Sequence, residues 1–482
     1  MSRALLCLLV LSGCPKKTDQ MPTSSRIYDA APEALSPRPF LLPQVSEGTL
    51  SNGIKVAVVE NHEVPLVYVR VILESGSWTD PSDQPGLASA TVDLMNEGAG
   101  EYSSDELSRA LRVLASDLTT GAGLDGSAIS LKSLKENLPA SLDLMATVTL
   151  EPTFPQPEWE LSQARRIQDV KAIAQDPRSI SGRAWSRLMY GTDYAGQLST
   201  VPSYEAMTTD DMRGWYSDHV TADNATILVG GDTTLSEVLP LLEARFSSWE
   251  PGDSEPVSPP SGSIPAAVTG QVYLIDKPGA AQSIVRLGQV IGDRQAPDAA
   301  AFELANMAIG GQFTARINMN LREDKGWTYG ASAWIGHNHY PGSWNVYTSL
   351  VTQHTADGLR EILAEIAGMS ADAPVTAAEL AAGRGDLLGS WPVRFEQPGY
   401  LLDRTVDVRR YGLPSDWMAN YPDRLRAVTL DQAQQAWLDR IDPDQFIILV
   451  VGDAAMVRAP LEGLGLSVVQ LGLDGAPLNS EQ

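Results

Sequence analysis

The chain of 482 residues carries 60 acidic and 35 basic side chains, which gives a formal net charge of -25. This excess of negative charge argues against binding to nucleic acids or to anionic membrane surfaces, and it suits neutral or cationic partners. Apolar residues make up 43% of the sequence, and no apolar run approaches the roughly 20 residues that span a bilayer. The length exceeds that of one ordinary core, so we expect about two domains.

The first residues have the pattern of a bacterial export signal. Arg3 precedes the apolar run ALLCLLVL, and the sequence LSGC then ends at Cys14, after which polar residues begin. LSGC resembles the lipobox of bacterial lipoproteins, which implies cleavage before Cys14 and attachment of a lipid to this cysteine. We therefore expect a signal peptide over residues 1–14. We also expect a protein that is lipid-anchored on the periplasmic side of the cell envelope, at either the inner or the outer membrane.

Two stretches without hydrophobic periodicity divide the rest of the sequence. Residues 15–45 are rich in Pro, Ser and Thr, which predicts a flexible tether. A second stretch of this kind, PGDSEPVSPPSGSIP, begins at Pro251, and we predict a linker over residues 251–267. The predicted domains are therefore residues 46–250 and residues 268–475.

The two predicted domains repeat one pattern. Segment 207–232 aligns without a gap on segment 428–453, and each predicts a helix capped by a threonine, followed by a strand that ends at Gly-Asp. Each domain also opens with strands and continues into helical spacing. The segments are GIKVAVVE, LVYVRVILES and LASATVDLMNEG in the first domain, and QVYLIDK, QSIVRLGQVI and DAAAFELANMAIGG in the second. Strands and helices that fall in blocks predict an α+β fold, present twice.

The segment GGQFTARINMNLREDKGWTYG, residues 310–330, joins a predicted helix to a predicted strand. Phe313, Ile317 and Leu321 recur every four residues, which is the spacing of one buried helical face. Gly326 is a typical helix stop, and WTYGASAWI then has the composition of a strand. We therefore predict a helix that ends at Gly326 and a strand that follows it at once.

This junction places two side chains with binding chemistry close together in sequence. Arg322 falls in the last turn of the predicted helix and Tyr329 in the predicted strand. Arginine is a rigid fork of donors that suits a carboxylate or a peptide carbonyl, and tyrosine adds a directional hydroxyl on a stiff ring. The pair therefore has the chemistry to hold a peptide; an exposed helix-end cation and a core-filling strand residue are the alternatives. Gly310 and Gly311 would let a backbone approach closely, and we count them as candidate peptide contacts.

Four segments together carry a resemblance to a known family. They are LSNGIKVAVVENHEVPLVYVRVILESGSW, GGQFTARINMNLREDKGWTYGA, GSWPVRFEQPGY with RRYGLPSDW, and ILVVGD, and the likeness spans residues 45–475. The chain resembles the pitrilysin or insulinase-type zinc peptidases, in particular their short bacterial branch that is similar to mitochondrial processing peptidase. The resemblance implies two homologous domains, each an antiparallel sheet packed with helices, that form half of a clam-shell chamber. It also implies that Arg322 and Tyr329 hold the backbone of a substrate beside the zinc ion of the opposite domain.

The same resemblance indicates that the first domain lacks the zinc-binding motif of the family. Cleavage in this family needs an inverted zinc motif, His-x-x-Glu-His, on the first helix of that domain. Gly86-Leu87 matches the glycine-leucine pair before this motif. The match places Ser89 and Asp93 where the two histidines would stand and Val92 where the glutamate would stand. Zinc hydrolysis needs imidazole ligands and a carboxylate base, and Ser89 and Val92 supply neither. We therefore predict a degenerate zinc motif, no catalytic residue and no metal bound by this chain.

The sequence offers two alternative metal sites. The third zinc ligand of the family lies on a later helix, where Asp169 is nearest by approximate spacing. Asp93 and Asp169 could hold a weak cation, but aspartates on amphipathic helices are more often solvated or ion-paired. His337 and His339 are two residues apart, yet GHNHYPG around them is typical of an exposed turn. No two of the five histidines have the four-residue spacing of the family motif; they are His62, His219, His337, His339 and His354.

Some members of this branch divide the work between two chains, one with the zinc motif and one with the Arg-Tyr pair, and this chain resembles the second kind. We therefore expect the non-catalytic, substrate-binding subunit of a heterodimeric zinc endopeptidase that degrades or processes extended or unfolded peptides in the bacterial envelope. The expected partner is a homologous subunit that carries His-x-x-Glu-His and holds the zinc. The alternatives are a catalytically dead scaffold of a membrane-associated complex and a peptide-binding lipoprotein that acts alone.

Overall fold

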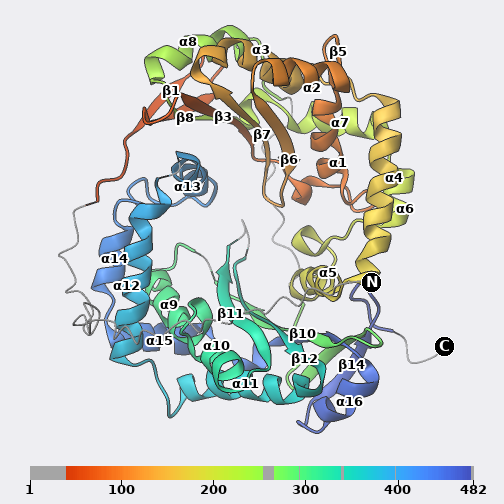
Figure 1. Cartoon of the computed structure of the whole chain (residues 1–482), viewed down its shortest axis with the longest axis vertical. Coiled ribbons are helices and arrows are strands. Elements are labelled where there is room, and N and C mark those ends of the chain that lie inside the picture. Colours follow the sequence, from red (N-terminus) through yellow and green to blue (C-terminus); the bar gives the residue numbers. More distant parts are fainter. Residues whose placement is uncertain (1–39, 253–264, 293, 338–340, 397, 479–482) are drawn as a thin grey trace, which may run out of the picture. The chain divides into compact units, whose positions relative to one another are not determined.

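Two sheets, one in each half of the sequence, form the framework of the chain (Figure 1). The computed structural model describes residues 40–252, 265–292, 294–337, 341–396 and 398–478. The predicted signal peptide with Cys14, most of the predicted tether and most of the predicted linker lie outside these residues. No helix within the described ranges combines the length and apolar composition of a membrane span.

Each sheet has six strands in the described part of the chain. The strands of the first sheet are β1 (Val45–Thr49), β2 (Lys55–Glu60), β3 (Leu66–Leu73), β6 (Asp117–Ala122), β7 (Ser127–Leu134) and β8 (Ala225–Gly231). Those of the second sheet are β9 (Gln271–Asp276), β10 (Gln282–Val290), β11 (Thr328–Gly336), β12 (Ser343–Val351), β13 (Ile447–Gly452) and β14 (Ser467–Leu471). A short hairpin pairs β4 (Gly98–Ala99) with β5 (Tyr102–Ser103).

The two sheets share one topology over five strands. The first has the order β1-β2-β8-β3-β7-β6, and the second, read from its other edge, has the order β14-β9-β13-β10-β12-β11. The pairs β2/β8 and β9/β13 are parallel, and the other shared pairs are antiparallel. The sixth strands differ, because β1 pairs antiparallel with β2 whereas β14 pairs parallel with β9. The predicted α+β fold with an internal repeat is confirmed, and β6 and β11 occupy equivalent edges. The expectation of purely antiparallel sheets is wrong, because the parallel pairs make both sheets mixed.

Helices surround both sheets. Those of the first half are α1 (Leu87–Leu94), α2 (Ser104–Val113), α3 (Leu138–Leu150), α4 (Gln156–Ala172), α5 (Pro177–Tyr190), α6 (Val201–Ala206), α7 (Thr209–His219) and α8 (Leu235–Phe246). Those of the second half are α9 (Ala299–Asn306), α10 (Arg316–Asn318), α11 (Thr355–Ser370), α12 (Ala377–Arg394), α13 (Pro398–Arg410), α14 (Tyr421–Ala427), α15 (Leu430–Arg440) and α16 (Ala454–Glu462). The repeat is visible in α7 and α15, whose N-caps Thr208 and Thr429 both close a capping box, as the sequence predicts.

The two faces of the first sheet belong to different cores. In β2, Val56 and Val58 join the core that also contains residues of α3 and α8, whereas the alternate residues Ala57 and Val59 join a second core. Helices α3 and α8 lie along their face of this sheet in Figure 1. The other face is covered by α13, which contacts β2 and β8 and contributes Leu402. A helix from the second half of the sequence therefore completes the sheet of the first half.

The second sheet shows the reciprocal arrangement. In β9, Val272 and Leu274 join the core that includes α9 and α11, whereas Ile275 joins a separate cluster with Trp185 of α5. Helix α5, from the first half, contacts β10 and β13, and the Trp185 indole donates a buried hydrogen bond of 3.0 Å to the Asn345 side chain of β12. The two halves thus exchange helices α5 and α13, each of which covers the other half's sheet.

Candidate functional site

The three degenerate positions of the zinc motif lie on α1, as predicted. Asp80 fixes the start of this helix, because its carboxylate accepts hydrogen bonds of 2.7 Å from the backbone N–H groups of Gly86 and Ala88. Val92 is fully buried in the core of the first half, whereas Ser89 and Asp93, one helical turn apart, are partly exposed. Ser89 and Asp93 are therefore the two positions that a ligand could reach.

Arg166 of α4 occupies the place between these two side chains. Its Nη1 donates to the Ser89 hydroxyl at 3.2 Å, and its Nη2 donates to the Ser89 carbonyl at 3.1 Å and to Asp93 Oδ2 at 2.5 Å. The guanidinium also lies 5.7 Å from the centre of the Tyr204 ring, and the Arg166 side chain is only 14% exposed. The positive charge of Arg166 therefore lies between the two accessible positions of the degenerate motif.

These residues do not fit a zinc ion. A zinc site needs imidazole, thiolate or free carboxylate ligands, and the cleft offers a hydroxyl and a carboxylate that is already bonded to a guanidinium. Burial raises the pKa of Asp93, and the charge of Arg166 opposes that rise. Within the described ranges, no three His, Cys, Asp or Glu side chains are grouped to hold a metal. That the chain binds no metal stays a prediction.

The cleft around Arg166 is an acidic cavity of about 440 Å³ between α1, α4 and β6. Asp169 lines the same cavity, so Asp93 and Asp169, the pair considered as a weak cation site, do lie in one cleft. The Asp93 carboxylate is bonded to Arg166, which favours the alternative that these aspartates are ion-paired with the protein. Four carboxylates and two guanidiniums line the cavity; they are Asp93, Glu97, Glu158 and Asp169, and Arg165 and Arg166.

The second candidate pair lies where the sequence places it. Arg322 is in a π-helical turn, Met319–Asp324, that continues α10, and Tyr329 is the second residue of β11. Tyr329 is 90% exposed, which excludes the alternative that it fills the core. The Arg322 guanidinium stacks 4.5 Å from the centre of the Phe313 ring, and its Nε lies 3.5 Å from a Glu323 carboxylate oxygen. Arg322 is thus held on a flat ring and remains partly exposed.

The predicted helical face before Arg322 is only partly correct. Ile317 and Leu321 are fully buried, but Phe313 is 58% exposed and lies in a turn. The reason is that the helix begins only at Arg316. Phe313 lies in the turn before it, and the Asn318 side chain donates a hydrogen bond of 2.7 Å to the Phe313 carbonyl. Phe313 therefore precedes the helix, and its ring supports Arg322 instead of the core.

A β-bulge presents Tyr329 at the surface. The pairing of β11 with β12 shifts register between Thr328 and Ala331. The Thr328 hydroxyl bonds to the Gly330 carbonyl at 2.9 Å, and the Asn318 side chain accepts the Ala331 N–H at 3.0 Å. Bulges re-aim a side chain in this way, and they are enriched next to functional sites. In the described part of the chain, nothing forms a hydrogen bond with the Tyr329 hydroxyl, so it is available to a ligand.

The two glycines of this segment pack against the chain's own strand. Gly310 and Gly311 end a π-helical turn, Met307–Gly311, that follows α9. A Cβ atom on Gly310 would lie 2.6 Å from the Cβ and N atoms of Ala333 in β11, so the close backbone approach is made to that strand. Gly311 is exposed, and a Cβ there would meet Met307 Sδ at 2.9 Å. Contact of these glycines with a peptide stays a prediction.

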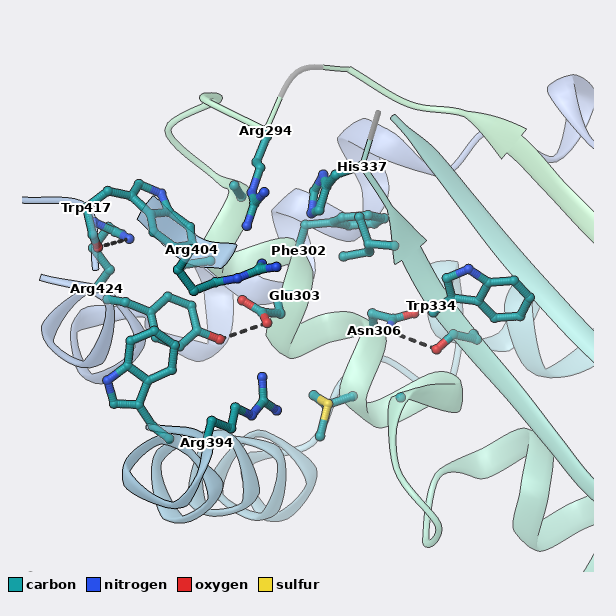
Figure 2. Close-up of a pocket in the computed structure, with 18 of the residues that line it drawn as sticks. Arg294, Phe302, Glu303, Asn306, Trp334, His337, Arg394, Arg404, Trp417 and Arg424 are labelled. Carbon is teal, nitrogen blue, oxygen red and sulfur yellow. Dashed lines mark hydrogen bonds between the residues drawn. The ribbon is translucent and has the colours of Figure 1, made fainter. Parts of the chain in front are cut away.

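The histidines have separate surroundings. His337 follows β11 and lines a cavity in the second half, whereas His339 lies outside the described residues (Figure 2). The alternative metal site at His337 and His339 therefore lies partly outside the described residues. The other three histidines have partners elsewhere: His62 with Asp232, His219 with Trp215, and His354 with Trp327.

Sequence reasoning missed Arg166. It named Asp169, which lies one turn further along the same helix and lines the same cleft. The signal was present, because a carboxylate, Asp93, stands where the motif has a histidine and calls for a cationic partner, and Arg165 and Arg166 were candidates. Choosing between these neighbours requires the rotation of α4 relative to α1, which spacing alone does not give.

Two models of one protein family match the chain. The insulinase model of Peptidase family M16 matches residues 55–197, and the Peptidase M16 inactive domain matches residues 206–386. An uncharacterized zinc protease of Mycobacterium leprae is 22% identical over 362 residues, which cover 75% of this chain and 81% of that protein. A non-peptidase homolog of Helicobacter pylori is 23% identical over 397 residues, which cover 79% of this chain and 88% of that protein.

A solved structure supports the fold. The peptidase M16 inactive domain from Pseudomonas fluorescens has a TM-score of 0.78 at 23% identity, and the match covers 85% of this chain and 98% of that one. The two family models together extend from β2 into α12, so they include both α1 with its degenerate motif and the Arg322 segment. The chain therefore belongs to peptidase family M16, the insulinase family, as a member that lacks the His-x-x-Glu-His motif.

Proposed function

We propose that this chain is a non-catalytic M16 subunit that holds extended peptides with Arg322 and Tyr329 while a homologous subunit with His-x-x-Glu-His hydrolyses them. The observation that carries the proposal is an asymmetry between the halves. The degenerate zinc motif of the first half is bonded to a guanidinium, Arg166, whereas the second half has a partly exposed Arg322 and, seven residues later in the sequence, Tyr329 on an exposed bulge. The chain thus retains binding groups and lacks hydrolytic ones.

The geometry suits a peptide backbone. The Arg322 guanidinium lies over the Phe313 ring and remains partly exposed, so N–H donors are available to a ligand. These donors match a peptide carbonyl or a terminal carboxylate, and the exposed Tyr329 hydroxyl can donate or accept one more hydrogen bond. Both side chains are mounted on ordered elements, a π-helical turn and a bulged strand, so little conformational freedom is lost on binding.

Charge favours basic peptides. The net charge of -25 would draw cationic chains towards the molecule. The acidic cavity between α1 and α4 adds a local contribution, since its four carboxylates outnumber its two guanidiniums. We infer that peptides with lysine or arginine residues are preferred to acidic ones.

The partner and the location belong to the same proposal. The zinc would be held by the homologous subunit, and the lipid on Cys14 would keep the complex on the periplasmic side of the envelope. The match to the M16 inactive domain and the likeness to a protein described as a non-peptidase homolog support a division of labour between chains. Metabolic labelling with a fatty acid, compared between the natural chain and Cys14→Ser, tests the anchor.

The decisive experiment is reconstitution with the partner. The native complex is purified from the envelope, its subunits are identified, and turnover of an unfolded basic peptide is measured. Arg322→Ala and Tyr329→Phe should each reduce turnover about 10-fold or more, because each removes a hydrogen bond to substrate worth about 1.5 kcal/mol or more. Arg360→Ala removes an exposed arginine of α11 that pairs with Asp357, and it serves as the control.

The zinc content of the complex should be the same in all variants. Unchanged turnover in both Arg322→Ala and Tyr329→Phe would contradict the proposal. A stable complex without any subunit that carries His-x-x-Glu-His, and without peptidase activity, would point to the scaffold instead.

A further inference from the structure

The second half contains a cavity at the place that corresponds to the acidic cleft of the first half. Helices α9 and α12 and strand β11 occupy the positions in the repeat that α1, α4 and β6 occupy in the first half. Residues of α9, α12 and β11, together with α13 and α14, enclose a cavity of about 300 Å³ (Figure 2). The internal repeat has thus produced two pockets, and they differ in charge.

Guanidiniums line the second cavity. Five arginines line it, namely Arg294, Arg394, Arg404, Arg424 and Arg440, and Figure 2 labels all of them except Arg440. Arg294 and Arg404 are both anchored on Asp407, at 3.2 Å and 2.6 Å. A pocket of this kind in a chain with a net charge of -25 concentrates positive charge where the rest of the molecule is negative. The cavity therefore favours an anionic group.

One carboxylate, Glu303 of α9, faces these arginines. Its hydrogen bond among the described residues is to the Tyr421 hydroxyl at 2.8 Å, and no ion pair joins it to a described arginine. Arg394, Arg294 and Arg424 are near enough for their charges to lower the pKa of Glu303, although burial, the largest effect, raises it. A carboxylate and several guanidiniums thus face each other across a gap.

Donors remain available on the arginine side. Arg394 forms a long hydrogen bond of 3.4 Å to Ser390, and Arg404 is fixed through Nη1 while its Nε is buried without a hydrogen-bond acceptor. A guanidinium carries five N–H donors, so neither group is saturated by the protein. The buried Arg404 Nε has no acceptor, and a ligand that supplies one is correspondingly favoured.

The remaining wall is apolar and aromatic. It consists of Phe302, Trp334, Trp391, Trp417 and Tyr421. A cavity of about 300 Å³ is at the small end of ligand pockets, which suits a ligand of one or two amino-acid residues. The pocket therefore combines an anion-binding side, a cation-binding group and an apolar surface.

We propose that this pocket binds a small zwitterion, an α-amino acid or dipeptide with an apolar side chain. Its carboxylate meets Arg394 and Arg404, its ammonium group meets Glu303, and its side chain lies against the tryptophans. The proposal does not depend on Arg322 or Tyr329, and it adds a second binding site to the chain.

Calorimetric titration of the intact chain tests this proposal. The probes are L-phenylalanine and L-leucyl-L-leucine, with their N-acetylated and amidated forms, and inorganic phosphate. We expect saturable binding of an unmodified probe, and weakening of about 10-fold or more when either end is blocked, because each end loses a charged hydrogen bond. Phosphate should not compete.

Variants locate the site. Glu303→Gln and Arg394→Ala should each weaken binding about 10-fold or more, whereas Arg426→Ala, an exposed arginine of α14 that pairs with Asp423, should leave binding unchanged. Thermal unfolding establishes that each variant is folded, and Arg394→Lys provides a second test should Arg394→Ala not fold. Arg322→Ala should bind the probes normally, which separates this site from the proposed function.

Two results would overturn the inference. One is the failure of the folded natural chain to bind any of the unmodified probes. The other is binding that survives N-acetylation and is displaced by phosphate, since that behaviour describes a general anion site without a role for Glu303.

Discussion

Arg166 and Asp93 are joined by a hydrogen bond of 2.5 Å that ties α4 to α1. The same guanidinium binds the hydroxyl and the carbonyl of Ser89, the other accessible position of the degenerate motif. A protein cation therefore links the two helices at the point where the family uses a metal ion. The Arg166 guanidinium thus places a positive charge between the two helices at the degenerate motif.

Loss of this link should lower stability by a modest amount. Arg166→Ala and Asp93→Asn should each reduce the free energy of unfolding by about 1–2 kcal/mol, because the bond is charge-assisted but Asp93 is 44% exposed and screened by solvent. Urea unfolding of the two single variants and the double variant measures the coupling. Strictly additive effects would show that the pair does not interact.

Arginine should also block restoration of the metal site. A triple variant, Ser89→His, Val92→Glu and Asp93→His, rebuilds the family motif, yet it should retain little zinc while the Arg166 guanidinium remains in the cleft and repels a second cation. Adding Arg166→Ala should raise the zinc content towards one ion per chain. Metal analysis after dialysis gives the answer, and equal zinc in both variants would contradict this interpretation.

The contact of Gly310 with β11 gives a packing prediction. Gly310→Ala places a Cβ 2.6 Å from Ala333, so the strand must shift, and we expect a loss of about 1–3 kcal/mol. Gly385→Ala in α12 is the matched control, because a Cβ there meets nothing within 4 Å and should stabilise the helix by about 0.5–1 kcal/mol. Thermal unfolding of both variants checks the contrast, and similar effects would argue against tight packing at Gly310.

The exchanged helix α5 should make unfolding cooperative. Trp185→Phe removes the indole N–H that binds Asn345 and leaves a buried amide oxygen unpaired, which should lower the free energy of unfolding by about 1–3 kcal/mol.

Since α5 joins the first half to the second sheet, circular dichroism and tryptophan fluorescence should report one unfolding transition for the whole chain. Two separate transitions would contradict the idea that the halves fold together.

His62 should make a small part of the stability pH-dependent. Its Nδ1 lies 2.6 Å from Asp232, and this hydrogen bond, with a second one to Glu60, raises the pKa of His62. The protonated form therefore stabilises the folded chain fully below the unfolded pKa of about 6.5, and this contribution is lost as the pH rises through the higher folded pKa. The difference in melting temperature between the natural chain and His62→Gln should shrink from about pH 5.5 to about pH 8.5. A melting-temperature difference between the two proteins that stays the same at every pH would contradict this prediction.

Much of the fold follows from local pattern. Period-two strands, capping threonines and the repeated Gly-Asp ends predict the two similar sheets, and the helix stop at Gly326 predicts the junction that separates Arg322 from Tyr329. Phe313 shows the limit, because its four-residue spacing matched a buried face although the helix begins after it. A second limit is the identity of the α4 residue that binds α1. Choosing Arg166 over Asp169 requires knowing how these two helices, distant in sequence, pack against each other.

The exchange of α5 and α13 could not be predicted from periodicity. Both helices have ordinary amphipathic patterns, and their apolar faces give no sign of which sheet they cover. Only the tertiary contacts assign each one to the half of the chain that does not contain it.

This exchange changes what the internal duplication means. A fragment that ended in the predicted linker would take α5 away from the second sheet and leave the first sheet without α13, so each fragment would expose an apolar surface. A cut through that linker should instead leave a nicked protein that stays whole. The two halves repeat one topology, but each depends on a helix from the other to cover its sheet.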